Sequence, residues 1–338
     1  MKRFAVFGVL VLNAIPIHAE FGIHIKDTGD GAIHELSFSQ DGKLLAVRGG
    51  VEQPTLSIWD FEAKKRVSRF ANRYGHVFPQ FSEDGLFIYS VGRKFSKSDP
   101  VGWEIYRHNA KTDGRKLVAE SDAPDLCHAL WIDKRMIVTS GIDLDDADKK
   151  PLLTFLDYGT KKTHVVHVAR KFKVMTFSRD RNLVAIRFEK GHINVINWET
   201  KNIIYDVQLQ LQANQQCDAC LFVYNDKRLF LVITGAGAPT IVIADIASKK
   251  LTRVNESYAG FPSPRYPPLL SPDGRFVVTQ APSGFGVFDV ERLAYTSMVR
   301  PKSRIELSGA LVFTSNGKAL VAGDTSGAIW TIGFPFPK

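Results

Sequence analysis

The sequence predicts an all-β protein: a seven-bladed β-propeller built from four-stranded antiparallel blades. Three observations support this prediction. A strand–turn–strand motif recurs seven times, further strands follow each copy, and the N-terminal region supplies a strand that the last copy lacks. The composition, 44% hydrophobic and 23% charged, is that of an ordinary globular protein.

The motif first appears as FSQDGKLLAV, residues 38–47. Its turn carries an acid or amide, usually followed by glycine, and these residues tolerate the positive φ of a two-residue hairpin turn. The turn positions are spaced by 43 to 49 residues: Asp41, Asp84, Asp133, Asp180, Asp226, Asp273 and Asn316. A regular spacing of this kind indicates a repeat architecture.

Each copy continues into a third apolar strand and a short polar turn. A weaker fourth strand follows, as at 66–70 and 163–168. The third strands are expected at 56–60, 103–107, 153–157, 193–198, 241–245, 285–289 and 328–332. Four strands per unit of this length are typical of a propeller blade.

The first unit closes on Trp59-Asp60, and with it the chain resembles the WD40-repeat family over about residues 30–333. Trp198-Glu199 approximates the same pair, and Gly75-His76 is a displaced copy of the Gly-His pair that the family carries before each blade. The resemblance implies a seven-bladed propeller, and the degenerate motifs indicate a divergent one.

The seventh unit ends after its third strand, at 328–332. Residues 21–26 alternate apolar and polar side chains, as a half-buried strand does. We therefore expect residues 20–28 to complete the seventh blade, so that pairing between the two ends of the chain closes the ring and leaves no free edge there.

Residues 1–19 have the order of a secretory signal peptide: basic residues, an apolar run of about 14 residues, and a small residue before Glu20. We expect cleavage after Ala19, a single domain over 20–338, and a secreted or periplasmic protein without a transmembrane segment; the alternative is an uncleaved anchor. Lys2 and Arg3 are the only charged residues removed, so the formal charge falls from +9 to +7.

We call the top face the end of the blades that carries the connections from second to third strands and between blades; the other end is the hairpin face. Long insertions are expected on the top face at 92–102, 141–151, 210–220 and 256–268. Loops of this length in a tight repeat are often functional, although surface loops also tolerate neutral insertion. The predicted partner-binding residues are Arg93, Lys94, Phe95, Tyr258, Phe261, Arg265 and Tyr266, because aromatic and arginine side chains concentrate at interfaces.

Two of these insertions contain residues that can bind metals. Calcium ligands would be Asp143, Asp145, Asp146 and Asp148, although the glycine and final glutamate of an EF-hand loop are absent and Lys149-Lys150 can neutralise the charge. Otherwise no cofactor is expected. Three interpretations apply to Cys217 and Cys220. The preferred one is a local disulfide, the second is free buried thiols, and the third is half of a metal site.

The sequence carries no recognisable catalytic motif. The leading hypothesis is an exported, non-enzymatic scaffold that binds a protein partner through the top face. One alternative is a lactonase-like propeller hydrolase with a metal at the channel mouth, for which Glu35 and Glu306 are the available carboxylates. Another is a binder of anionic envelope polymers through lysines of the hairpin face; nucleic acid is not an expected partner of an exported protein.

Overall fold

The fold is almost entirely β-structure. The computed structural model describes residues 16–17, 21–50, 54–71, 77–82, 84–96, 99–121, 129–131, 136–142, 151–157, 162–167, 172–180, 182–197, 199–200, 202–235, 239–254, 268–281, 284–299 and 305–333. Within these residues 29 strands form seven sheets, and the remaining regular element is a single 3-10 turn at Glu189–Gly191.

We number the sheets in chain order. The first sheet contains β3 (Ile33–Phe38), β4 (Leu44–Gly49), β5 (Thr55–Asp60) and β6 (Lys65–Ala71). The second contains β7 (Val77–Phe81), β8 (Phe87–Ser96), β9 (Asp99–Asn109) and β10 (Arg115–Ser121). The third contains β11 (Ala129–Trp131), β12 (Met136–Ile142), β13 (Pro151–Asp157) and β14 (Lys162–His167). The fourth sheet contains β15 (Phe172–Phe177), β16 (Leu183–Phe188), β17 (His192–Asn197) and β18 (Ile203–Gln208). The fifth contains β19 (Gln216–Val223), β20 (Arg228–Thr234), β21 (Thr240–Asp245) and β22 (Leu251–Val254). The sixth sheet contains β23 (Leu269–Leu270), β24 (Phe276–Ala281), β25 (Gly284–Asp289), β26 (Ala294–Val299) and the N-terminal β1 (Pro16–Ile17). The seventh contains β27 (Leu307–Phe313), β28 (Ala319–Asp324), β29 (Ile329–Gly333) and the N-terminal β2 (Phe21–Ile25).

The N-terminal strand β2 pairs antiparallel with β29, with Phe21 opposite Ile332 and Ile25 opposite Ile329. The backbone N–H of Thr28 then donates a 3.0 Å hydrogen bond to the carbonyl of Gly327. The predicted pairing of segment 20–28 with the last unit is therefore confirmed. An unpredicted strand, β1, comes from the expected signal peptide and lies parallel to β26 at the outer edge of the sixth sheet.

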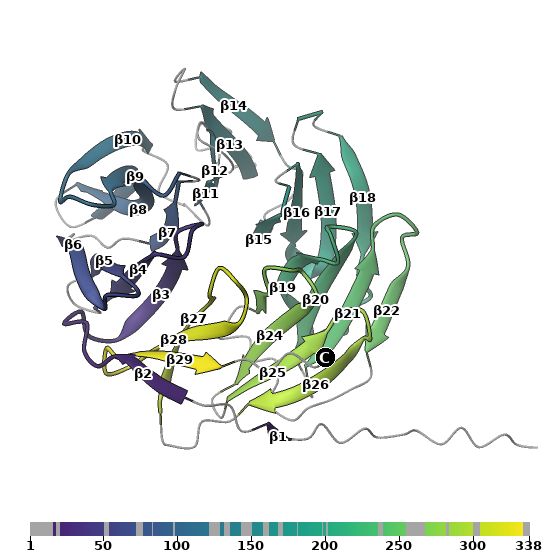
Figure 1. Ribbon diagram of the computed structural model, residues 1–338. Helices are drawn as coiled ribbons and strands as arrows, with labels where there is room; N and C mark the ends of the chain where they lie inside the picture. Colours follow the sequence, from purple (N-terminus) through teal and green to yellow (C-terminus); the bar gives the residue numbers. More distant parts are fainter. Residues whose placement is uncertain are drawn as a thin grey trace, which may run out of the picture.

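Successive sheets pack face to face through apolar side chains. Five buried clusters join the fourth sheet to the fifth, the fifth to the sixth, the sixth to the seventh, the seventh to the first, and the first to the second. Figure 1 shows the sheets following one another in chain order, with the seventh beside the first. The core therefore lies between sheets, which explains why the strands are apolar on both faces.

Five of the described hairpin turns between first and second strands share one hydrogen-bonded geometry. In each of the five, a serine or threonine hydroxyl donates to the turn acid or amide two residues later, at 2.5 to 2.9 Å, and accepts the N–H five residues later. The turn of the fifth sheet differs: Tyr224 takes the place of the serine, and Tyr224, Asn225 and Asp226 all have positive φ. The described pairs are Ser39–Asp41, Ser82–Asp84, Ser178–Asp180, Ser271–Asp273 and Thr314–Asn316. The recurring polar residues are thus used in forming the turns.

These turns also touch one another across the sheets. Gly42 in the first sheet has φ +73° and lies against Ser315 of the seventh, where a Cβ would overlap the serine hydroxyl. The carboxylate of Asp226 in the fifth sheet accepts the N–H of Arg179 in the fourth at 2.9 Å. Similar contacts link the fifth, sixth and seventh turns and the first and second. From the fourth sheet round to the second, the described turns form a continuous line of neighbours.

Candidate functional site

Segment 209–215 connects β18 of the fourth sheet to β19 of the fifth, on the top face. It has a defined conformation: the N–H of Leu209 donates to the carbonyl of Gly191 at 3.0 Å, and the N–H of Gln215 donates to the carbonyl of Gln212 at 2.9 Å. The N–H of Gln212 in turn donates to the Gln215 side chain at 3.1 Å. The expected insertion 210–220 is therefore shorter than predicted, because residues 216–220 belong to β19.

A glycine of the fifth sheet provides the space that this segment occupies. Gly235 has φ +142°, and a Cβ there would overlap the backbone carbonyl of Asn214. Only glycine combines this backbone conformation with so close an approach. The top-face connection is thus held directly against the turn that follows β20.

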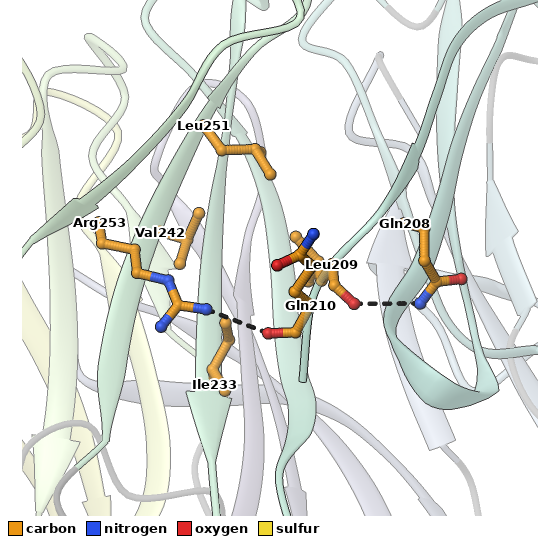
Figure 2. A pocket seen from close by; sticks show the side chains of 7 residues that line it. All are labelled: Gln208, Leu209, Gln210, Ile233, Val242, Leu251 and Arg253. Atoms are coloured by element: carbon orange, nitrogen blue, oxygen red, sulfur yellow. Dashed lines mark hydrogen bonds between the residues drawn. The ribbon is translucent and has the colours of Figure 1, made fainter. Parts of the chain in front are cut away.

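A pocket of about 210 Å³ lies at the outer part of the junction between the fourth and fifth sheets, beside segment 209–215. It is lined by Gln208, Leu209, Gln210, Ile233, Val242, Leu251 and Arg253. Figure 2 shows these side chains and two hydrogen bonds, from Arg253 to the carbonyl of Gln210 at 3.1 Å and from the Gln208 amide to the carbonyl of Leu209 at 3.1 Å. The lining therefore combines four apolar side chains with two glutamines and one cation.

Arg253 is the cation of this pocket. Among the described residues its one hydrogen-bond acceptor is the Gln210 carbonyl, and none of their carboxylates lies within ion-pair distance of it. A guanidinium has five N–H donors, and the described residues use only part of this donor capacity. No sequence motif points to Arg253 or Leu251, because both lie in the weak fourth strand of the unit. They become a site only when the fourth sheet packs beside them.

The two cysteines lie in β19, and both thiols are free and buried. The local disulfide that we ranked first is therefore not formed. A bulge between Cys217 and Ala219 turns both thiols toward the fourth sheet, where they join the same apolar cluster.

Burial makes both thiols poor nucleophiles. It raises the pKa of Cys217 to about 12 and the pKa of Cys220 well above its ordinary value, while the nearby guanidinium of Arg187 acts in the opposite direction on both. Arg187 itself is only 5% exposed. The free thiols fit our second interpretation, structural buried cysteines, because a reactive cysteine needs a depressed pKa.

The predicted partner-binding residues divide into two groups. Arg93, Lys94 and Phe95 lie in β8, and the ladder with β9 continues past them to Ser96 opposite Asp99. The expected insertion 92–102 is therefore an extended β-hairpin rather than an irregular loop, because its backbone keeps pairing. The remaining four, Tyr258, Phe261, Arg265 and Tyr266, lie outside the described residues.

The predicted calcium ligands Asp143, Asp145, Asp146 and Asp148 also lie outside the described residues. Within the described part of the chain, no group of three or more His, Cys, Asp and Glu side chains is placed to hold a metal. Of the two carboxylates considered for a hydrolase, Glu35 forms an ion pair with Arg48 at 3.4 Å and Glu306 is exposed.

None of the described residues forms a helix with the length and apolar character needed to cross a membrane.

No protein-family model matches this chain, and no curated protein matches it.

Proposed function

We propose that this protein is an exported, non-enzymatic scaffold, a closed seven-bladed β-propeller related to the WD40-repeat family, that binds a protein partner through its top face. The closed ring is supported by the order of the sheets, by the clusters that join them from the fourth round to the second, and by the pairing of β2 with β29.

The observation that carries the choice of face is the contrast between the two ends of the sheets. On the hairpin face, five of the described turns repeat one geometry, and neighbouring turns contact one another. On the top face the connections differ in length and composition from unit to unit, as segment 209–215 and the β8–β9 hairpin illustrate. Recognition of a particular partner requires residues that the repeats do not share.

The test is capture of partners from the native envelope fraction with the mature chain as bait. One variant carries Arg93→Ala, Lys94→Ala and Phe95→Ala, which keeps the hairpin backbone; a second replaces residues 256–266 with a glycine–serine linker. The matched control changes the hairpin face instead, with Lys64→Glu and Lys249→Glu, two exposed turn lysines.

We expect both top-face variants to lose the captured partner, while the control variant retains it and all thermal transitions stay close to that of the parent. Loss of binding only in the control would move the interaction to the hairpin face and support an anionic-polymer binder. Capture that is unchanged in every variant would refute the top-face proposal.

A further inference from the structure

The pocket between the fourth and fifth sheets is smaller than the roughly 300–1,000 Å³ of sites that enclose a drug-sized ligand. Its volume of about 210 Å³ suits one aliphatic side chain. Its floor is made by Leu209, Ile233 and Val242, with Leu251 at the rim, 37% exposed. The occupant that matches this size and lining is a single apolar group.

The charge beside the floor restricts the occupant further. Val242 and Arg253 are directly opposite each other in the β21–β22 ladder, so their Cβ atoms are about 5 Å apart. If an acidic group binds Arg253 while an apolar group packs on Val242, the two groups must therefore belong to the same residue or to immediate neighbours. An aliphatic residue at the end of a polypeptide meets this requirement, since its carboxylate and its side chain share one Cα.

The pocket walls are already in place without a ligand. The Arg253 guanidinium is tied to the Gln210 carbonyl, and the Gln208 amide donates to the carbonyls of Lys190 and Leu209, at 2.6 and 3.1 Å. Figure 2 shows Arg253 and Gln210 facing each other, with Leu251 above them. Preorganised walls reduce the ordering cost of binding.

We propose that this pocket binds the carboxyl-terminal aliphatic residue of a partner polypeptide, with the side chain on Val242 and Ile233 and the carboxylate on Arg253. The inference rests on the proposed function, because it takes the partner to be a protein. It extends that function to a contact at the outer part of the junction between the fourth and fifth sheets. Capture of a terminal carboxylate is an established mode of peptide recognition.

The first probe is N-acetyl-leucine, titrated into mature protein with labelled Ile, Leu and Val methyl groups and followed by NMR; N-acetyl-leucinamide is the neutral match. We expect the Val242, Ile233 and Leu251 methyl signals to shift, with binding of the amide about tenfold weaker because it lacks the charge-assisted hydrogen bond. Equal binding of both compounds, or shifts confined to other methyl groups, would overturn the proposal.

A second pair of probes separates a chain terminus from a free small acid. A hexapeptide ending in leucine is compared with its C-terminally amidated form. We expect the free-acid peptide to shift the same methyl signals as N-acetyl-leucine does, and more tightly. If only N-acetyl-leucine bound, the pocket would be a small-acid site and the assignment to a polypeptide end would be wrong.

Variants then test the residues. Arg253→Gln should abolish the preference for acid over amide, and Leu251→Glu should weaken N-acetyl-leucine binding at least tenfold. The matched control is Leu117→Glu, in the outer strand β10 and 42% exposed, which should leave binding unchanged. If Leu251→Glu behaved like its control, the pocket would not be the site.

The same variants serve as bait in the capture experiment. If they lost the probe but kept the partner, this assignment of the partner's contact would fail while the top-face proposal stood. If the top-face variants also kept the partner, the proposed function itself would fail.

Discussion

The carboxylate of Asp30 accepts a 2.5 Å hydrogen bond from the hydroxyl of Ser57. The same hydroxyl oxygen accepts the indole N–H of Trp59 at 2.9 Å, and the Arg69 guanidinium lies 3.0 Å from the other carboxylate oxygen. The side chain of Asp30 is fully buried. Trp59 of the Trp-Asp pair is thus linked through Ser57 to Asp30, which precedes the first strand of the sheet.

Removing this carboxylate leaves the Ser57 hydroxyl buried without its acceptor. We expect Asp30→Ala to lower the free energy of unfolding by about 2–3 kcal/mol, and Ser57→Ala by about 1–2 kcal/mol. The comparison is Asp60→Ala, which removes only an exposed turn bond to the N–H of Ala63 and should cost about 0.5–1 kcal/mol. Urea titration of the three variants checks this order; equal losses would contradict it.

Gly235→Ala should destabilise the protein by more than 2 kcal/mol, because the new methyl group overlaps the Asn214 carbonyl and the backbone conformation is unfavourable for alanine. Gly333→Ala is the matched variant, since nothing lies within 4 Å of its Cβ position. It should stay within about 0.5 kcal/mol of the parent. Thermal unfolding that fails to separate the two variants would show that segment 209–215 is not held against the β20–β21 turn.

The buried thiols give a pH dependence. In the unfolded chain a thiol ionises near pH 8.5, whereas burial raises the pKa of Cys217 to about 12 in the folded state. Between these values the folded state binds more protons, so its stability falls as pH rises, by up to about 1.4 kcal/mol per pH unit for each thiol. Cys217→Ala should give a shallower decline between pH 9 and 11, measured by urea unfolding. A parallel decline in both proteins would exclude Cys217 as the cause.

The N-terminal strand should be required for folding, and the segment before it should not. A chain beginning at Glu20 keeps β2 and loses only β1, whereas a chain beginning at Gly29 also loses the pairing with β29 and the buried Ile25. We expect the first to unfold at nearly the temperature of the full chain and the second to be strongly destabilised. A synthetic peptide of residues 20–28 should restore the second chain; no effect of the longer truncation would contradict the role of β2.

Export predicts that the envelope form begins at Glu20. N-terminal sequencing of protein from the native source checks this directly. A chain that retains residues 1–19 would instead match the uncleaved anchor, and its Pro16–Ile17 strand would remain on β26.

The sequence determined the strands, because alternating and continuous apolar runs bounded by Asp-Gly turns fix the period and the register of each unit. It also determined the pairing of β2 with β29, since the last unit visibly lacked a strand that the N-terminal region could supply. These are local patterns or counts of units, and they can be read along the chain.

Which residues from different units meet depends on how the sheets pack against one another. The two cysteines are close in sequence, yet it is a bulge in β19 that turns both free thiols toward the fourth sheet. The pocket combines Leu209, which follows the fourth sheet, with Val242 and Arg253 of the fifth sheet, and no shared motif links these residues. Packing between sheets is set by side-chain volume across the junction, and that information is absent from any single repeat.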